Sequence, residues 1–286
     1  MHTSIARVND KYPVRLVKVI TALKVSRSGY YRHFCLKKED RDVGDYELVK
    51  HIFDDRKGRV GIRQIKMLLA RRLSVVMNHK KIARIKKKYG LETQIRKKNK
   101  YKSFAKKRHE HRTCANKLAR RFKVKRPDKV YSTDITQMNY GKGLRAYIAA
   151  FKDLCTKEIV AFKVSQRSDV ALVTDALHQA IKGRCGNKKL MIHSDQGYHF
   201  THFSYRKILQ DHKIKQSMSR RGNCLDNAPI ESLFGHLKDH IDLSRCKTID
   251  EVKEVVTGEI DYYNNHRPQV GLKKMPPALY RRHLES

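Results

Sequence analysis

The order of strand and helix patterns between residues 130 and 241 is the feature that most limits the fold. Three segments of strand character come first, separated by turn residues, at 130–138, 144–151 and 158–164. Patterns of a helix, a buried strand, a short helix, a strand and a final helix follow at 169–181, 189–195, 202–210, 214–218 and 228–241. Hairpins followed by crossovers predict a mixed five-stranded sheet with helices on its faces, an α/β fold.

The charge of the chain is extreme and unevenly spread. The 286 residues carry a formal net charge of +37, which makes a polyanion the expected partner, the alternative being a merely very soluble or ribosome-like protein. Residues 56–126 hold 28 Lys or Arg and two acids, whereas residues 127–286 hold 26 basic and 18 acidic residues. This change in the balance of basic and acidic residues predicts a domain boundary near Pro127. The run over 97–112 has little apolar periodicity and predicts a linker that orders only on a phosphate backbone.

The N-terminal part is predicted to be helical. Short helices are expected within 13–36, and three more between residues 45 and 89 resemble a helix-turn-helix module. Asn78 is expected to cap the third of these, and Gly90 to end it. Its outward basic residues are expected to contact DNA, and a small helical bundle with a solvated basic face is the alternative. These residues are Lys80, Lys81, Arg84, Lys86, Lys87 and Lys88.

Several classes of protein are excluded by the sequence. No apolar run of 18 residues is present, so we expect no membrane span, and the N-terminus has no secretory signal core. The six cysteines form no CxxC pair, which argues against a zinc knuckle and a disulfide framework. His109, His111 and Cys114 lack a fourth zinc ligand. Reduced cysteines in a cytoplasmic protein are the expectation.

Three carboxylates stand where metal ligands are expected. Asp134 interrupts an apolar strand, Asp195 ends a buried one, and Glu231 lies in the first turn of an amphipathic helix. The first and fourth strands of a mixed sheet can be neighbours, which would bring the two aspartates together. Each acid alone is more often a surface, turn or capping residue. Lys238 shares the helix edge with Glu231, with a local ion pair as its alternative.

Other polar residues near these acids receive lesser roles. Asp226 is expected to cap the helix that carries Glu231, and Arg220 and Arg221 are expected to contact phosphate rather than to form core ion pairs. The histidines in this region have no acidic or cysteine partner at zinc spacing, so supporting or surface roles are expected. They are His193, His199 and His202.

Thirty-five residues separate Asp195 from Glu231. With this spacing, the chain resembles the bacterial insertion-sequence transposases of the retroviral-integrase type, and specifically the product of the second of two overlapping reading frames. The segments that carry the resemblance are Tyr131–Thr136, His193–Gly197, Ser219–Ser232 and Tyr263–Pro268, with Val25–Tyr31 and Val76–Ile82 upstream. The resemblance covers nearly the whole chain. It implies a ribonuclease H-like core with the expected order of elements.

The resemblance also implies a site and a reaction. Asp134, Asp195 and Glu231 would bind two Mg²⁺ (or Mn²⁺) ions, with Asp134 bridging them, and Lys238 would lie near DNA. Water would cleave the DNA at the ends of the insertion sequence, and the freed 3′-OH would attack target DNA without a covalent protein intermediate. Alternatives are a non-catalytic DNA-binding regulator and a nuclease of the same fold without strand transfer.

The resemblance extends to partners and domains. We expect a homo-oligomer on DNA, a fusion to or partner from an upstream frame that this chain lacks, and a bacterial cytoplasmic location at the nucleoid. The expected domains are an N-terminal helical segment (1–40), the helix-turn-helix-like module (41–95), a basic linker (96–126), the catalytic core (127–245) and a C-terminal helix and tail (246–286).

Overall fold

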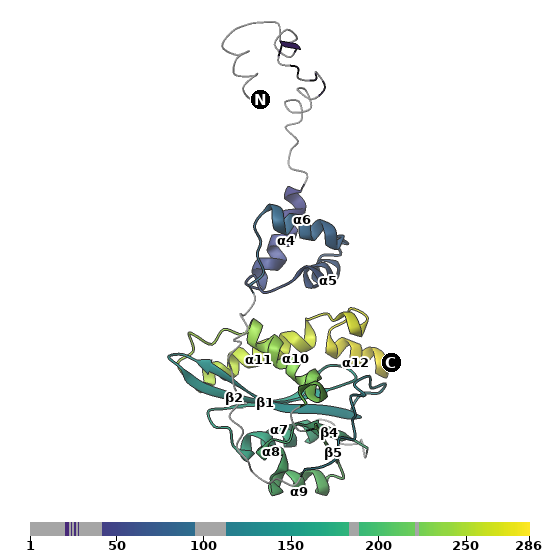
Figure 1. Cartoon of the computed structure of the whole chain (residues 1–286), viewed down its shortest axis with the longest axis vertical. Coiled ribbons are helices and arrows are strands. Elements are labelled where there is room, and N and C mark those ends of the chain that lie inside the picture. Colours follow the sequence, from purple (N-terminus) through teal and green to yellow (C-terminus); the bar gives the residue numbers. More distant parts are fainter. Residues whose placement is uncertain are drawn as a thin grey trace.

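The computed structural model describes residues 42–94, 113–182, 189–220 and 223–286, with a few isolated positions between 21 and 28. The predicted N-terminal segment therefore lies almost wholly outside the described residues, as do Arg221 and most of the basic run. Within these ranges, no helix is both long and apolar enough to cross a membrane. Two bodies are visible in Figure 1, a small helical module and a larger core built on one sheet.

The sheet of the core has the order β3-β2-β1-β4-β5. Its strands are β1 (Val130–Tyr140), β2 (Leu144–Asp153), β3 (Ile159–Ser165), β4 (Met191–Ser194) and β5 (Lys215–Met218). The first three strands pair antiparallel as a meander, and β4 and β5 add in parallel beyond β1. The predicted mixed five-stranded sheet and the neighbouring first and fourth strands are both confirmed.

Helices cover both faces of the sheet, which gives three layers (Figure 1). One apolar cluster joins the sheet to α10 (Ala228–His240) and α11 (Ile249–Asn265). A second cluster, on the other face, joins it to α7 (Val170–Lys182) and α9 (Phe203–Asp211). Shorter elements complete the core: α8 (Tyr198–Thr201), the 3-10 turns Cys224–Asn227 and Val270–Leu272, and α12 (Pro277–Glu285). Val252 and Val256 of α11 belong to the first cluster, so α11 is packed into the core.

Residues 97–112, predicted to order only on phosphate, lie outside the described residues, but residues 113–126 of the predicted basic linker contact the core. The backbone N–H groups of Lys117 and Leu118 both donate to the Ser217 hydroxyl of β5, at 3.0 and 3.1 Å. Leu118 is also buried, in a small cluster with Val130 and Leu154. Residues 113–126 therefore lie on the core as irregular chain with a turn at 119–120, because a few apolar side chains among the charges find partners there.

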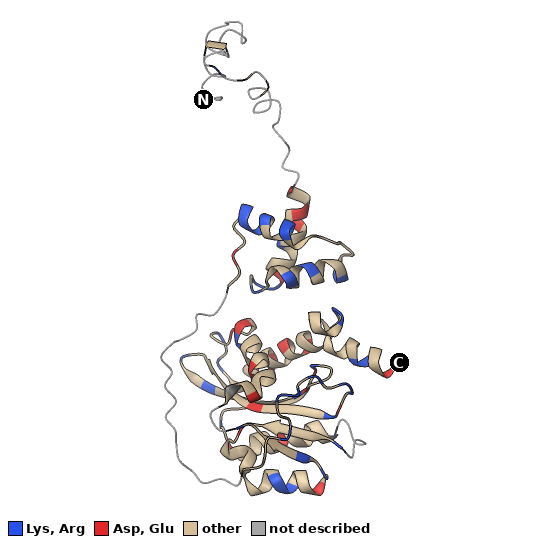
Figure 2. Cartoon of the chain, turned by 45° about the vertical axis from the view of Figure 1, so that its right-hand side comes forward, with Lys and Arg blue, Asp and Glu red and all other residues tan. Residues whose placement is uncertain are grey.

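The helical module consists of α4 (Val43–Asp55), α5 (Ile62–Arg72) and α6 (His79–Lys88) around one apolar cluster. The predicted cap on the third helix is confirmed, since the Asn78 side chain accepts a bond from the Lys80 N–H at 2.9 Å. Lys and Arg run along α5 and α6 (Figure 2). The prediction that Lys86 points outward is wrong, because its aliphatic stem is buried and its ammonium lies 4.0 Å from the centre of the Phe53 ring.

Most of the outward basic residues on α6 have acidic partners at the N-terminal end of α4, on its N-cap residue Asp42 or on Asp45 in its first turn. Lys81 pairs with Asp45, and Arg84 and Lys88 both pair with Asp42, at 2.5 and 3.2 Å. Lys80 and Lys87 are exposed and make no ion pair with a described residue. Exposed pairs of this kind contribute little to stability.

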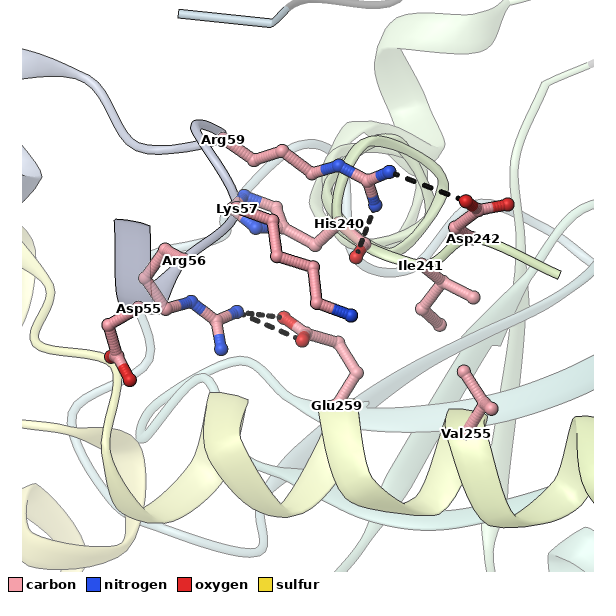
Figure 3. A pocket seen from close by; sticks show the side chains of 9 residues that line it. All are labelled: Asp55, Arg56, Lys57, Arg59, His240, Ile241, Asp242, Val255 and Glu259. Carbon is pink, nitrogen blue, oxygen red and sulfur yellow. Dashed lines mark hydrogen bonds and ion pairs between the residues drawn. The ribbon is translucent and has the colours of Figure 1, made fainter. Parts of the chain in front are cut away.

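The module contacts the core through the loop after α4 (Figure 3). The Arg56 guanidinium donates two bonds to the Glu259 carboxylate of α11, at 3.0 and 3.1 Å, and lies 3.5 Å from the centre of the Tyr262 ring. Arg59 donates to the carbonyl of His240 at the end of α10, at 2.7 Å. A guanidinium at this position satisfies one of the unpaired carbonyls of a helix C-terminus.

We expect Glu259→Gln to loosen this contact. The side chains of Arg56 and Glu259 are only 15% and 10% exposed, so removing the carboxylate leaves a cation held near the core without its partner. Small-angle X-ray scattering at low salt should then give a larger radius of gyration than for the wild type. Glu254→Gln, an exposed residue on the same helix, is the matched control. Equal radii for wild type and Glu259→Gln would contradict the expectation.

Candidate active site

The pairing of β1 with β4 places two of the predicted acids side by side. Ser132 pairs with His193 in parallel register, and Asp134 and Asp195 each lie two residues further along their chains. The same register therefore brings the two aspartates opposite one another where β4 ends. Both side chains are half-buried. This edge, at the carboxyl ends of the parallel strands, is where ligands gather in α/β proteins.

Backbone N–H groups orient both carboxylates. The N–H of Ile135 donates to Asp134 Oδ1 at 2.7 Å, and the N–H of Gly197 donates to Asp195 Oδ1 at 2.9 Å. A Cβ atom added to Gly197 would stand 2.9 Å from the same Asp195 oxygen. Residue 197 therefore has to be glycine for the Asp195 carboxylate to keep this position.

The charges at this site are poorly compensated. Burial, and then the neighbouring Asp195 and Glu231, raise the pKa of Asp134 to about 8, against the lowering effect of Lys238. Burial also raises the pKa of Asp195. The pKa of Glu231 is raised by burial and by Asp195. A buried carboxylate whose pKa is raised by two neighbouring acids belongs to a site that favours added positive charge.

Glu231 approaches this pair from another layer of the core. It lies in the first turn of α10, behind Pro229, and is exposed. A pocket of about 260 Å³ is lined by both aspartates and by Gly197 and His199, but not by Glu231. In the part of the chain that the structure describes, no three His, Cys, Asp or Glu side chains are already arranged to hold a metal ion.

Comparison with known proteins assigns the family. Residues 124–224 and 212–277 match the integrase core domain, and residues 39–99 match an HTH-like domain. A protein of Escherichia coli (strain K12), named as transposase InsK for insertion sequence element IS150, is 35% identical over 272 residues, which are 94% of this chain and 94% of that protein. The chain belongs to the insertion-sequence transposases.

The chain is also similar to a second insertion-element protein and to a solved integrase structure. The 31 kDa protein of insertion element IS600 from Shigella sonnei is 31% identical over 264 residues, 90% of this chain and 95% of that protein. Among solved structures, the HTLV-2 integrase catalytic core domain in complex with magnesium covers 55% of this chain and 97% of its own, with a TM-score of 0.42 and 14% identity. The matched integrase core, together with the observed strand order, confirms the predicted ribonuclease H-like fold.

The prediction that Asp226 caps α10 of this transposase is wrong. Its side chain is completely buried and accepts bonds from Arg120 and Arg220, while α10 has no side-chain cap. The two guanidiniums hold the pKa of Asp226 far below its usual range. Two charge-assisted bonds stabilise a buried carboxylate better than a backbone N–H does. Arg220 was expected to contact phosphate rather than to form a core ion pair, and it does pair with this buried carboxylate. Its contact with phosphate stays a prediction.

The three histidines of the motif region have separate places in the transposase. His193 is buried, with its Nε2 3.0 Å from the Asp226 carbonyl and its Nδ1 2.9 Å from the Ser217 hydroxyl, and burial lowers its pKa. His199 lines the aspartate pocket and bonds to Ser168. His202 caps α9 through its ring nitrogen.

The site also uses residues that the sequence patterns did not single out. Arg120 comes from the segment before β1, 106 positions away from the carboxylate that it contacts. Gly197 belongs to the segment His193–Gly197 that carries the family resemblance, but its role depends on the orientation of the Asp195 carboxylate, to which its N–H donates. In the sequence, this role is indicated only by a glycine two residues after a candidate metal ligand.

Proposed function

We propose that Asp134, Asp195 and Glu231 of this transposase would hold two divalent metal ions, Mg²⁺ or Mn²⁺. The observation that carries the proposal is the pair of half-buried aspartates, Asp134 on β1 and Asp195 directly after the adjacent parallel strand β4, each with a raised pKa. Their donors are carboxylate oxygens, the ligands that Mg²⁺ prefers. Glu231 is exposed in the first turn of its helix, so a change of rotamer is available to bring it to the pair.

The proposed reaction has two steps at one site. First, a water oxygen forms a bond to phosphorus at the end of the insertion sequence, the bond to the bridging oxygen breaks, and a 3′-OH is freed. That hydroxyl then forms a bond to a target phosphorus and displaces the neighbouring oxygen of the target strand. Divalent ions bound at such a site supply positive charge to the attacked phosphate and to the leaving oxygen.

The side chains of the protein hold and orient the reactants in this scheme. The N–H groups of Ile135 and Gly197 fix the two aspartates, and α10 carries Glu231 and Lys238 together. Lys238 contributes positive charge close enough to lower the pKa of Asp134. We propose that this ammonium contacts the phosphate next to the bond that is cut. Lys80, Lys81, Arg84 and Lys87 of α6 are proposed to bind DNA away from the site.

One assay distinguishes the proposed function from its alternatives. Labelled DNA that carries an end of the insertion sequence is incubated with target DNA and the full chain, with Mg²⁺ or with EDTA. A joined product that depends on Mg²⁺ is expected. Cut DNA without joining would identify a nuclease of the same fold, and neither product would leave a DNA-binding protein. Either of the last two results would overturn the proposal.

We expect Gly197→Ala to reduce strand cleavage by about ten- to a hundred-fold, because a misplacement of about 1 Å at a reaction site can lower the rate by about a hundred-fold. The added Cβ would push the Asp195 carboxylate away from its N–H donor. Cleavage rates are compared with those of Gly258→Ala in α11, where nothing lies within 4 Å of the added atom. Equal rates for both variants would show that the position of Asp195 is not held by Gly197.

We also propose that the transposase acts as an oligomer that pairs two DNA ends, in the bacterial cytoplasm at the nucleoid. The basic character of the chain supports association with DNA. Mass photometry with and without end DNA tests the oligomer directly. A single chain on each DNA end at saturating concentration would contradict it.

A further inference from the structure

We propose that Arg120 and Arg220, held together by the buried Asp226, form a binding site for a DNA backbone phosphate beside the metal-binding carboxylates. The proposal rests on the proposed function, because it supplies a contact for the DNA that the site would cut. It adds a residue from the segment before the core, Arg120, and gives Asp226 a positioning role.

The two guanidiniums are fixed by one carboxylate. Arg120 Nε donates to Asp226 Oδ1 at 2.7 Å, and Arg220 donates through Nε to Oδ2 at 2.9 Å and through Nη2 to Oδ1 at 3.1 Å. The Arg220 backbone N–H and the Asn116 side chain also donate to Oδ2, at 3.1 and 2.9 Å. The carboxylate is fully buried, so this geometry is protected from water.

Part of each guanidinium remains available to a ligand. The side chains of Arg120 and Arg220 are 41% and 59% exposed, although the acid between them is buried. Arg120 Nη2 donates to Asn223, and the Nη1 group of both arginines has no partner among the described residues. Two cations and one anion give the group a net charge of +1. A planar guanidinium whose rotamer is already fixed binds phosphate with little further loss of entropy.

The group lies at the same edge of the sheet as the aspartates. The N–H of Ser219, the residue before Arg220, donates to the Ser194 carbonyl at 2.9 Å, and the Ser219 carbonyl accepts from Gln196 at 3.0 Å. Ser194 and Gln196 flank Asp195. Asp226 in turn directly precedes Asn227, after which α10 carries Glu231. A phosphate held by the two arginines is therefore bound at the rim of the proposed active site.

A purely structural role for Arg120 is less well supported. The segment that carries it is already attached to the core by the buried Leu118 and by two backbone bonds to Ser217. A second anchor would not require two arginines on one carboxylate, since one cation neutralises one anion. The extra guanidinium gives the group its positive charge, which is what a phosphate site needs.

The test measures DNA binding in EDTA, so it does not depend on catalysis. Fluorescence anisotropy follows binding of an end duplex and of a scrambled duplex over a range of salt concentrations. Arg120→Gln and Arg220→Gln should each weaken binding equally on both duplexes and lower the slope of log affinity against log salt by about one. Arg245→Gln, an exposed arginine beyond the other end of α10, should change binding less.

Asp226→Asn separates an organised site from charge alone. The substitution removes one negative charge from the chain, so simple electrostatics predicts tighter binding, whereas loss of the shared carboxylate predicts weaker binding. Circular dichroism checks that the variant is folded. If it is not, Arg120→Lys provides the same distinction, because it keeps the charge but loses the planar fork. Wild-type affinity for both Gln variants, or for Arg120→Lys, would overturn the phosphate site, even if the enzyme cuts DNA as proposed.

Discussion

Asp134→Asn should abolish cleavage and joining of DNA while leaving DNA binding nearly unchanged. Asp134 would be one of the ligands of the proposed ions, and a neutral amide is a much poorer ligand for Mg²⁺. The reacting phosphate loses several kcal/mol of stabilisation, which corresponds to a decrease in rate of at least about 10³-fold. Asp175→Asn, an exposed acid in α7, is the matched control and should retain wild-type rates. Cleavage by Asp134→Asn at a tenth of the wild-type rate would remove Asp134 from the site.

The same substitution should make the ion-free protein more stable at high pH. Burial, Asp195 and Glu231 raise the pKa of Asp134 from 3.8 to about 8, so between these values the folded chain holds a proton that the unfolded chain has released. The free energy of unfolding contributed by this group therefore falls as the pH rises from about 4 to about 8. Asparagine has no proton to lose. Urea unfolding in EDTA at pH 5 and pH 8 should show a smaller decrease for the variant, and Mg²⁺ should stabilise only the wild type.

The arrangement of the two aspartates could be predicted because it depends on local patterns. Strand periodicity and turn residues located β1 and β4, and the preference for hairpins and crossovers made them neighbours. Local rules also located the start of α6, since the Asn78 side chain accepts a bond from the nearby Lys80 N–H. Both signals lie within a few residues of the structure that they determine.

The ion pairs between residues far apart in the sequence could not be predicted from local patterns. Arg56 lies 203 positions from Glu259, and Arg120 lies 106 positions from Asp226. In a sequence with 65 Lys or Arg and 28 acids, no pattern indicates which cation meets which acid. Asp226 was misassigned because a helix cap is the commonest local role for an aspartate there. Its burial, which decides the matter, depends on the segment before β1.

Arg281→Gln should destabilise the core by about 3–5 kcal/mol, because it leaves a buried carboxylate without its cation. Arg281 of α12 contacts Asp128, Asp153 and Glu158 at 2.9, 3.2 and 2.7 Å, and Asp153 is fully buried. Burial raises the pKa of Asp153 even though Arg281 and neighbouring N–H groups donate to it. One guanidinium therefore holds three acids at the end of the sheet. Urea unfolding in EDTA, monitored by circular dichroism, measures the loss.

Two variants test whether this loss comes from the uncompensated acids rather than from damage to α12. Arg282→Gln changes the next residue, which is exposed, and should alter the free energy of unfolding by less than about 0.5 kcal/mol. Asp153→Asn in the Arg281→Gln background removes the buried charge and should restore part of the stability. Contacting residues show such non-additivity, commonly about 0.5–3 kcal/mol. If the two substitutions are simply additive, the repulsion among the acids is not what Arg281 relieves, and its effect lies in the packing of the helix.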